Sequence, residues 1–259
     1  MLTIRDYCTP ATLEEGYDLL QKKGSAVLGG GCWLNMGRTT LNRAIELNHL
    51  LSHSIEERED RFVIGAMTTL RAFETHPGLN AFFHGLPART VRPIVGVQFR
   101  NCATVGGSVY GRFGFSDVLT LLLTLDCQVE LFHAGVMPLE EFVSYGEKDI
   151  LTNVILRKTV DRAAIRSIRR NSNDFPVLVC AVSEQDGVLR AAVGARPNKA
   201  RLVVDRLDNG DGAAFAARVT EQMTFGSNLR GSAEYRTHLS RVLLGRCMEE
   251  LKGGAEEWK

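Results

Sequence analysis

Hydrophobic positions near the N-terminus follow the spacing of an amphipathic helix. Leu13, Tyr17 and Leu20 fall on one face, because residues three and four positions apart meet on the same side of a helix. Thr12 and Glu15 stand in capping-box register at its start, and two lysines and a glycine follow it. The pattern predicts a helix over residues 12–23 that leads into a strand at 26–28.

Further along, apolar runs alternate with polar turns. Runs rich in β-branched and aromatic residues predict strands, and an apolar pattern at 119–125 predicts a helix. The strands are expected at residues 43–47, 61–66, 129–132 and 151–156.

After about residue 160 the pattern changes to strands followed by helices. Strands are predicted at 164–169, 177–182 and 188–193, with a hairpin turn at Gln185-Asp186-Gly187. Helical spacing follows at 213–223 and 233–251.

This change of sequence pattern predicts two domains, because strands followed by helices are typical of a separate α+β layer. A frayed tail is expected after them. The first domain is expected over 1–160, with subdomains of about 1–55 and 56–160, the second over 161–252, and the tail over 253–259.

Composition narrows the class of protein. The chain has 259 residues, 44% of them hydrophobic and 24% charged, as in an ordinary globular protein. Its net charge of +1, without a long basic run, argues against a nucleic-acid partner. The acidic start is unlike a signal peptide, and the longest apolar run is too short to span a bilayer, so a cytoplasmic protein without a membrane partner is expected.

The six cysteines are scattered singly. None stands in a C-x-x-C pair or in a Cys/His cluster with the spacing of a zinc or iron–sulfur site. The sequence therefore predicts no metal site in this chain, and most of the cysteines are expected to be small buried apolar residues.

Two glycine-rich strings carry the candidate chemistry, LGGGCWLN at 28–35 and ATVGGSV at 103–109. Neither a Rossmann fingerprint nor a P-loop is present, since Leu34 stands where the fingerprint starting at Gly29 needs glycine. Two nests of backbone N–H groups are suited to grip one pyrophosphate without a lysine, as in a dinucleotide site. Each string taken alone is equally well explained as a tight turn.

Four longer strings resemble the medium FAD subunit of molybdenum hydroxylases, the family of xanthine dehydrogenase and carbon monoxide dehydrogenase. Gly30 to Leu34 are similar to its A-G-G-T-D-L element, and Val97 to Ser108 closely resemble its Q-I-R-N-x-x-T-I-G-G-N. Ile64 to Leu70 resemble I-G-A-x-T-T-L, and Arg230 to Arg236 contain S-A-E-Y-R. Because the four lie in the family's order from residue 28 to residue 236, the resemblance covers nearly the whole chain.

The resemblance implies an α+β chain with a PCMH-type (vanillyl-alcohol-oxidase-like) FAD-binding fold. Two α+β subdomains would hold FAD between them, followed by a C-terminal domain of a sheet plus helices. The cofactor-binding residues that it implies at the pyrophosphate and ribityl portions are Leu28, Gly29, Gly30, Gly31, Cys32, Trp33, Leu34, Asn35, Ala103, Thr104, Gly106, Gly107 and Ser108.

Four further positions match the family's flavin-site residues, each with a plain structural alternative. Asp117 corresponds to the sugar-binding Asp, but it could equally cap the helix beginning at Val118. Arg166 stands at the position of a Lys near the flavin, where a solvated strand residue is an equal alternative. Ile150 and Leu151 match an apolar contact with the flavin, and core residues would look the same.

The chain departs from the family pattern beside the cofactor. Cys32-Trp33 replace a Thr-Asp pair, so the hydrogen bonds of those side chains must come from the backbone or be lost. Trp33 is expected to pack in the protein or, alternatively, to stack on the cofactor. The proline that often precedes the family's Asp is absent from the string at 111–116.

The function implied is that of an electron relay without a catalytic acid or base. A large molybdopterin subunit would hydroxylate the substrate, a small iron–sulfur subunit would carry the electrons, and FAD would pass them to NAD or another acceptor. One alternative is a stand-alone FAD oxidoreductase of the vanillyl-alcohol oxidase type, although no convergent polar residues are found after residue 165. Another is a scaffold subunit that has lost FAD.

Overall fold

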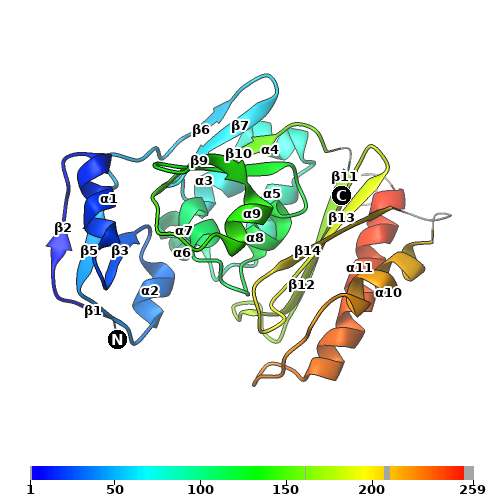
Figure 1. The fold of residues 1–259 in the computed structure, drawn as a ribbon. Helices are drawn as coiled ribbons and strands as arrows, with labels where there is room; N and C mark the ends of the chain where they lie inside the picture. Colours follow the sequence, from blue (N-terminus) through cyan, green and yellow to red (C-terminus); the bar gives the residue numbers. More distant parts are fainter. Residues whose placement is uncertain (1, 161, 207–210, 254–259) are drawn as a thin grey trace.

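The structure is a computed structural model that describes residues 2–160, 162–206 and 211–253. Three groups of strands and helices follow one another along the chain and lie side by side (Figure 1). Within the described residues, no helix combines the length and the hydropathy needed to cross a bilayer.

The N-terminal group is a small parallel sheet with helices on its flank. Its three strands are ordered β2-β5-β3, and a separate parallel pair joins β1 to β4. The elements are β1 Thr3–Ile4, β2 Tyr7–Cys8, α1 Leu13–Gln21, β3 Ser25–Leu28, α2 Cys32–Met36, β4 Thr40–Leu41 and β5 Arg43–Glu46.

Helix α1 forms for the reasons visible in its sequence. Thr12 Oγ1 accepts from the Glu15 N–H at 3.2 Å, and the Glu15 carboxylate accepts from the Ala11 N–H at 2.8 Å. The chain leaves the helix through Gly24, at a φ of +77°. The predicted helix is confirmed, although it ends two residues earlier than expected at Gln21.

The middle group surrounds an antiparallel sheet of five strands, ordered β6-β7-β10-β8-β9. Its strands are β6 Ile55–Glu57, β7 Arg61–Gly65, β8 Cys127–Leu131, β9 Gly135–Pro138 and β10 Leu151–Arg157. Its helices are α3 Leu70–Thr75, α4 Pro77–Phe82, α5 Leu86–Val91, α6 Val97–Cys102, α7 Val105–Tyr110, α8 Asp117–Leu122 and α9 Leu139–Ser144.

Strand β7 shows why this sheet has one buried face. Phe62 and Ile64 are fully buried, whereas Arg61 and Val63, which alternate with them, are half-buried, as the two-residue period of a strand requires. The strands predicted at 43–47, 61–66, 129–132 and 151–156 are confirmed as β5, β7, β8 and β10. The predicted helix at 119–125 is α8, which begins two residues earlier.

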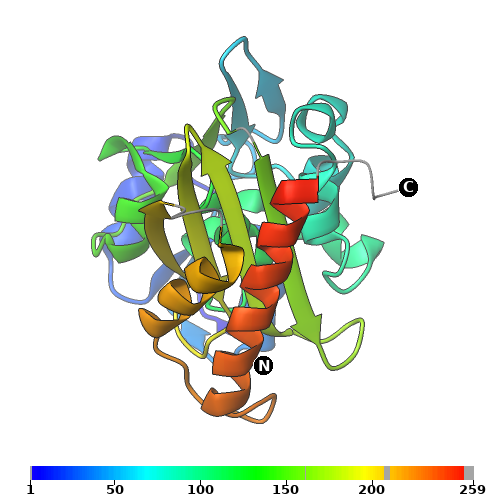
Figure 2. The same ribbon diagram turned by 90° about the vertical axis from the view of Figure 1, so that its right-hand side faces the viewer.

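The C-terminal group is an antiparallel sheet, ordered β11-β12-β13-β14, with two helices packed on one face (Figure 2). The elements are β11 Arg162–Arg169, β12 Pro176–Gln185, β13 Val188–Gly194, β14 Arg201–Arg206, α10 Gly212–Glu221 and α11 Ala233–Gly253. The predicted hairpin is confirmed, with Asp186 and Gly187 at φ values of +51° and +73°. Strand β14 was not predicted.

A second hydrophobic core lies between the C-terminal sheet and its helices, where Leu178, Phe215 and Leu244 are fully buried. The domain division near residue 160 remains a prediction. Of the predicted tail, Gly253 belongs to α11, and residues 254–259 lie outside the described part.

The arginine of the S-A-E-Y-R string organises the turn before α11. Arg236 is fully buried and donates to the carbonyl oxygens of Val177 at 3.0 Å and Gly226 at 2.8 Å. It also donates to Asn228 Oδ1 at 2.6 Å and to the Gly231 carbonyl. Burial lowers the pKa of this guanidinium, and its role here is structural.

Candidate functional site

The two glycine-rich strings are in direct contact, although about seventy residues separate them in the sequence. A Cβ atom on Gly30 would lie 2.5 Å from the Cys102 carbonyl carbon and 2.9 Å from Ala103 Cα. A Cβ atom on Gly29 would lie 2.9 Å from Thr104 Oγ1. Only glycine permits this approach at Gly30, because the obstructing atoms there are backbone.

The first string is a shorter turn than expected. Gly31 has a φ of +68° and ends the turn, since α2 begins at Cys32. Among the described residues, no protein acceptor faces the N–H groups of Gly30 and Gly31. These amides are therefore available to an anion.

The second string is not the nest of free amides that its glycines suggested. It opens helix α7, with Thr104 as N-cap accepting from the Gly107 N–H at 3.0 Å. The Val105 and Gly106 N–H groups donate to the carbonyls of Thr68 and Ala66 at 2.8 and 3.0 Å. Gly106 also packs against Ala66, whose carbonyl oxygen a Cβ atom would approach to 2.5 Å. The prediction of two amide nests is wrong for this string, which supplies hydroxyl groups and close packing.

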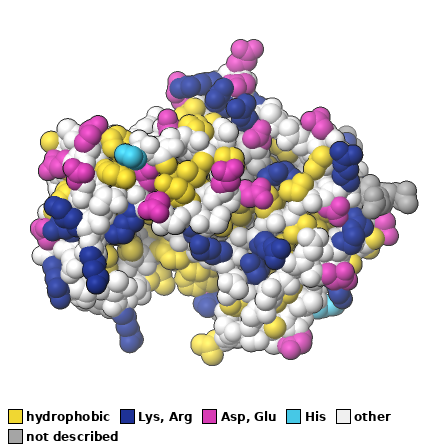
Figure 3. Space-filling model, viewed as in Figure 1, with side chains coloured by type: hydrophobic (Ala, Val, Ile, Leu, Met, Phe, Trp, Pro, Cys, Tyr) yellow, Lys and Arg dark blue, Asp and Glu magenta, His cyan; other side chains and the backbone are white. Residues whose placement is uncertain are grey.

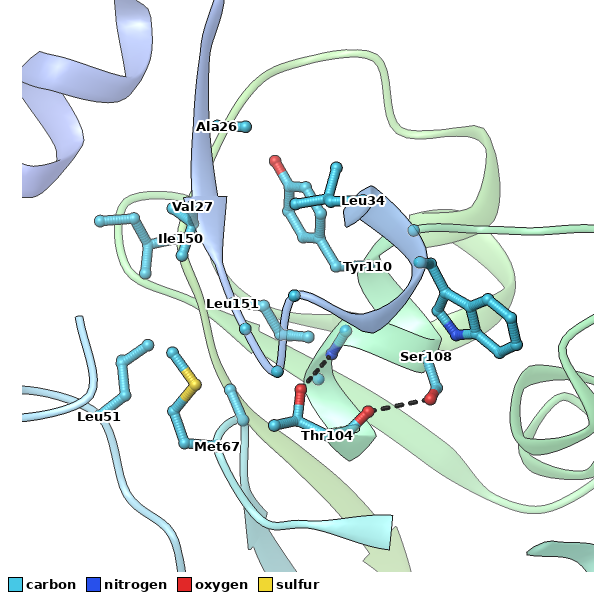
Figure 4. Close-up of a pocket in the computed structure, with 18 of the residues that line it drawn as sticks. Ala26, Val27, Leu34, Leu51, Met67, Thr104, Ser108, Tyr110, Ile150 and Leu151 are labelled. Atoms are coloured by element: carbon cyan, nitrogen blue, oxygen red, sulfur yellow. Dashed lines mark hydrogen bonds between the residues drawn. The ribbon is translucent and has the colours of Figure 1, made fainter. Parts of the chain in front are cut away.

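The strings border a first cavity of about 340 Å³ between the N-terminal and middle groups. In Figure 3 the molecule is hollowed between these two parts, with hydrophobic side chains in the floor. Figure 4 shows Ala26, Val27 and Leu34 on the N-terminal side, facing Ile150 and Leu151. The predicted site residues that line this cavity are Gly29, Gly30, Gly31, Cys32, Trp33, Leu34, Ala103, Thr104, Gly106, Gly107, Ser108, Ile150 and Leu151.

The charged residues of the first cavity are engaged with the protein backbone. Lys148 Nζ donates to the carbonyls of Leu20 and Lys22 at 3.2 and 3.3 Å. Asp149 is buried and accepts from the N–H groups of Ala134 and Ile150 at 2.8 and 2.7 Å. The remaining lining is mainly apolar, which suits a ring system more than a free charged group.

A second cavity of about 380 Å³ adjoins the first. The two share the residues Cys32, Trp33, Ser108 and Phe113. Both glycine strings thus contribute residues to the wall between the cavities, whereas their contact at Gly30 and Ala103 borders the first cavity alone.

Aromatic side chains surround Trp33 at this wall. Its ring centroid lies 5.0 Å from those of Phe99 and Phe115 and 5.2 Å from that of Phe175. Phe175 precedes β12, so the C-terminal sheet contributes to the second cavity. Trp33 thus packs among these rings as predicted, and because it also lines both cavities, its stacking on the cofactor stays a prediction.

Asp117 lines the second cavity and does not cap its helix. Ser116 is the N-cap of α8, with Ser116 Oγ accepting from the Leu119 N–H at 3.1 Å. Asp117 Oδ2 instead lies 2.7 Å from Arg169 Nη2, and both side chains are buried. Burial raises the pKa of the Asp117 carboxyl, and the Arg169 charge opposes that rise. The alternative that Asp117 caps the helix is therefore wrong.

Three of the expected site residues line neither cavity: Leu28, Asn35 and Arg166. Arg166 Nη2 lies 2.8 Å from Glu250 Oε2 of α11. Arg169, three residues later on β11, lines the second cavity instead, because side chains an odd number of positions apart point to opposite faces of a strand. The cation at the second cavity is Arg169.

Several cavity residues were not found from the sequence. Met67 and Tyr110 line the first cavity, and Phe115 and Phe175 line the second. The aromatic string at 113–115 was noticed only as a departure from the family pattern. Phe175 gave no signal, because nothing local links it to the glycine strings.

Comparison with known proteins identifies the family. The family described as the FAD binding domain in molybdopterin dehydrogenase matches residues 2–158. The chain belongs to this family, and FAD is the cofactor that the family binds. The predicted resemblance and cofactor are confirmed.

Individual relatives match along nearly the whole chain. The protein YgfM of Escherichia coli (strain K12) is 26% identical over 264 residues, covering 98% of this chain and 99% of YgfM. The nicotine 6-hydroxylase medium subunit of Paenarthrobacter nicotinovorans is 25% identical over 272 residues, covering 94% of this chain and 96% of that subunit.

Solved structures confirm the fold. A chain of the carbon monoxide dehydrogenase from Hydrogenophaga pseudoflava superimposes with a TM-score of 0.83 at 20% identity, covering 95% of this chain and 96% of that one. The predicted α+β, PCMH-type FAD-binding fold is thereby confirmed.

Proposed function

We propose that this chain is the FAD-carrying electron-transfer subunit of a molybdenum hydroxylase complex. The observation that carries the proposal is that the two glycine strings meet at the first cavity and both contribute to the wall that it shares with the second cavity. FAD consists of two ring systems joined by a pyrophosphate. Two adjoining, mainly apolar cavities match this shape, with the free amides of Gly30 and Gly31 just before the shared residue Cys32.

The residues present fit this cofactor. The free N–H groups of Gly30 and Gly31 face no protein acceptor within the described residues and suit the pyrophosphate. The Thr104 hydroxyl accepts from Gly107 and keeps its own hydrogen for a phosphate oxygen. Ile150 and Leu151 offer an apolar surface to a ring, and Asp117 retains one carboxylate oxygen for a sugar hydroxyl.

Other protein groups are expected to shield the cofactor. Trp33 and its aromatic neighbours exclude water from the wall between the cavities. A bound flavin takes up electrons singly and releases them in pairs. The chain therefore needs to bind, orient and shield the cofactor, and we propose no acid or base among its residues.

The proposed partners are a large molybdopterin-binding subunit and a small iron–sulfur subunit, in a xanthine dehydrogenase-like complex of the cytoplasm. Electrons would arrive from the iron–sulfur subunit and leave to NAD or another acceptor. The similarity to the nicotine 6-hydroxylase medium subunit supports this proposal, because a medium subunit is one part of a larger enzyme.

The cofactor is tested first with the purified chain. Flavin absorption bands near 370 and 450 nm, approximate values for any protein-bound flavin, together with heat-released FAD, are expected. A colourless chain that takes up no added FAD would contradict the proposal and favour a scaffold role.

The relay role is tested separately by partner binding and electron transfer. The chain, expressed with its own tag, is expected to co-purify with a molybdopterin protein and an iron–sulfur protein from its source cells. Flavin reduction by the substrate of that complex should then require both partners. A flavin that is reduced by an organic substrate in the chain alone would indicate a stand-alone oxidoreductase.

A further inference from the structure

One wall of the second cavity is a backbone turn in an unfavourable conformation. Pro93, Ile94 and Val95 line the cavity there. Val95 has a φ of +33° and Gly96 a φ of +127°. A positive φ is rare for a β-branched residue and persists only where the surrounding structure holds it. Val95 is also 49% exposed, so its own side chain does not hold the turn in place.

A buried ion pair behind the turn does hold it. Arg100 and Glu74 are 5% and 8% exposed. Arg100 Nε lies 2.8 Å from Glu74 Oε2, and Arg100 Nη2 lies 3.2 Å from Glu74 Oε1. These two parallel bonds fix the guanidinium to helix α3.

The third nitrogen of the same guanidinium reaches the turn. Arg100 Nη1 donates to the Ile94 carbonyl at 2.9 Å and to the Arg92 carbonyl at 3.2 Å. The carbonyl groups on both sides of Pro93 are thus held on the Arg100 side of the segment. The same segment lines the second cavity through Pro93, Ile94 and Val95, whereas Arg100 does not line it.

A buried ion pair is a poor way to gain stability, because apolar side chains of the same volume usually stabilise a core equally well. A planar guanidinium, however, holds a carboxylate and two carbonyl groups in one fixed geometry, which lysine does not. The pair therefore sets the shape of the turn and, through it, the width of the second cavity.

We infer that Arg100, anchored by Glu74, is a positioning residue that holds the 92–97 turn against one ring system of the bound cofactor. This inference rests on the proposed binding of FAD across the two cavities. Arg100 itself lines neither cavity and acts only through the turn.

The test measures dissociation constants of FAD and of its two halves, ADP and FMN, for folded variants. Arg100→Met is expected to weaken FAD binding about tenfold or more. It should weaken the binding of only one of the two halves, the one whose ring contacts the turn. Arg100→Lys and Glu74→Gln, which disturb the fold less, should show smaller losses for the same half.

Arg71→Ala is the matched control. Arg71 Nη1 lies 2.9 Å from the same Glu74 oxygen but approaches it from the surface and donates to no carbonyl of the turn in the described structure. This variant is expected to bind FAD and both halves as the wild type does.

A second-site change separates positioning from stability. Glycine takes a positive φ without strain, so adding Val95→Gly to Arg100→Met is expected to recover part of the lost affinity. Most of the lost melting temperature should remain lost, because Glu74 is still buried without its partner. Equal losses for both halves, or wild-type affinities in a folded Arg100→Met protein, would overturn the inference. A wild-type chain that binds no FAD would instead refute the proposed function.

Discussion

Substituting Gly30 by alanine tests whether the two glycine strings form one site. The added methyl group would lie 2.5 Å from the Cys102 carbonyl carbon, whereas ordinary contacts begin at 3.4 Å. The Cys102 carbonyl oxygen lies nearer still, so the two strings must separate by more than about 0.9 Å at this point. Neither side can yield by rotating a side chain, because both are backbone.

Gly30→Ala is expected to lower both the stability of the chain and its affinity for FAD. Overpacking costs typically about 1–3 kcal/mol, and the backbone contact places Gly30→Ala near the upper end of that range. At roughly 2–4 °C per kcal/mol for a protein of this size, the melting temperature should fall by about 5–10 °C. A separation of this size would also stretch a hydrogen bond of about 2.9 Å to the pyrophosphate past its useful limit. Losing one such charge-assisted bond, worth about 1.5–3 kcal/mol, lowers FAD affinity roughly ten- to hundredfold.

The assay combines thermal unfolding of the cofactor-free chain with fluorescence titration by FAD. Gly245→Ala is the control for the same chemical change, since nothing lies within 4 Å of a Cβ atom at this position in helix α11. It should stabilise the chain by about 0.5–1 kcal/mol. Gly31→Ala adds no clash but keeps a φ of +68°, and should cost about 1–2 kcal/mol. A Gly30→Ala protein with unchanged melting temperature and FAD affinity would refute the described contact.

Four further predictions concern other parts of the site and its support. Asp117→Asn leaves the buried Arg169 without a counter-charge and should destabilise the cofactor-free chain by about 3 kcal/mol. If Asp117 also binds FAD, the rise in melting temperature on adding FAD should be smaller in this variant than in the wild type. An unchanged rise would exclude Asp117 from FAD binding. Cys102 is exposed and should be the first thiol alkylated by iodoacetamide, detected by peptide mass spectrometry. Alkylation of Cys32 should be slowed by FAD. It should accelerate as the pH rises, because burial raises the pKa of the Cys32 thiol and leaves little thiolate at neutral pH. Alkylation of Cys32 at the same rate with and without FAD would contradict its place in the cavity. Arg236→Met removes the donors of four hydrogen bonds from a buried turn and should lower the free energy of unfolding in urea by about 3 kcal/mol or more; a loss below about 1 kcal/mol would show that the turn does not depend on it.

Local structure followed the sequence closely where short-range interactions decide it. The capped helix α1, the hairpin at Asp186-Gly187 and helix α11 form where capping residues, turn residues and apolar spacing predicted them. The motif strings also predicted the family, because the residues that bring two backbone segments together must be glycine whatever surrounds them.

The sequence could not show which groups of the site are free to bind. The second glycine string looks like an amide nest, yet its N–H groups are used by Thr68, Ala66 and Thr104. Whether an amide is free depends on distant carbonyl groups, and these become neighbours only when β7 and α7 pack together.

The sequence by itself determined the elements with strong capping, turn or apolar patterns, the family and the cofactor class, since these are written in local spacing and in short motifs. It did not predict the short helices α2 to α7 and α9 or strand β14. Tertiary structure alone decided that Arg169 rather than Arg166 faces the second cavity, and that Phe175 joins Trp33 at the wall. It also decided that Arg100 reaches the turn at Ile94. The physical reason is that cavities and buried charge pairs are formed by side chains far apart in the chain, whose neighbours are set by the register of sheets and the packing of helices.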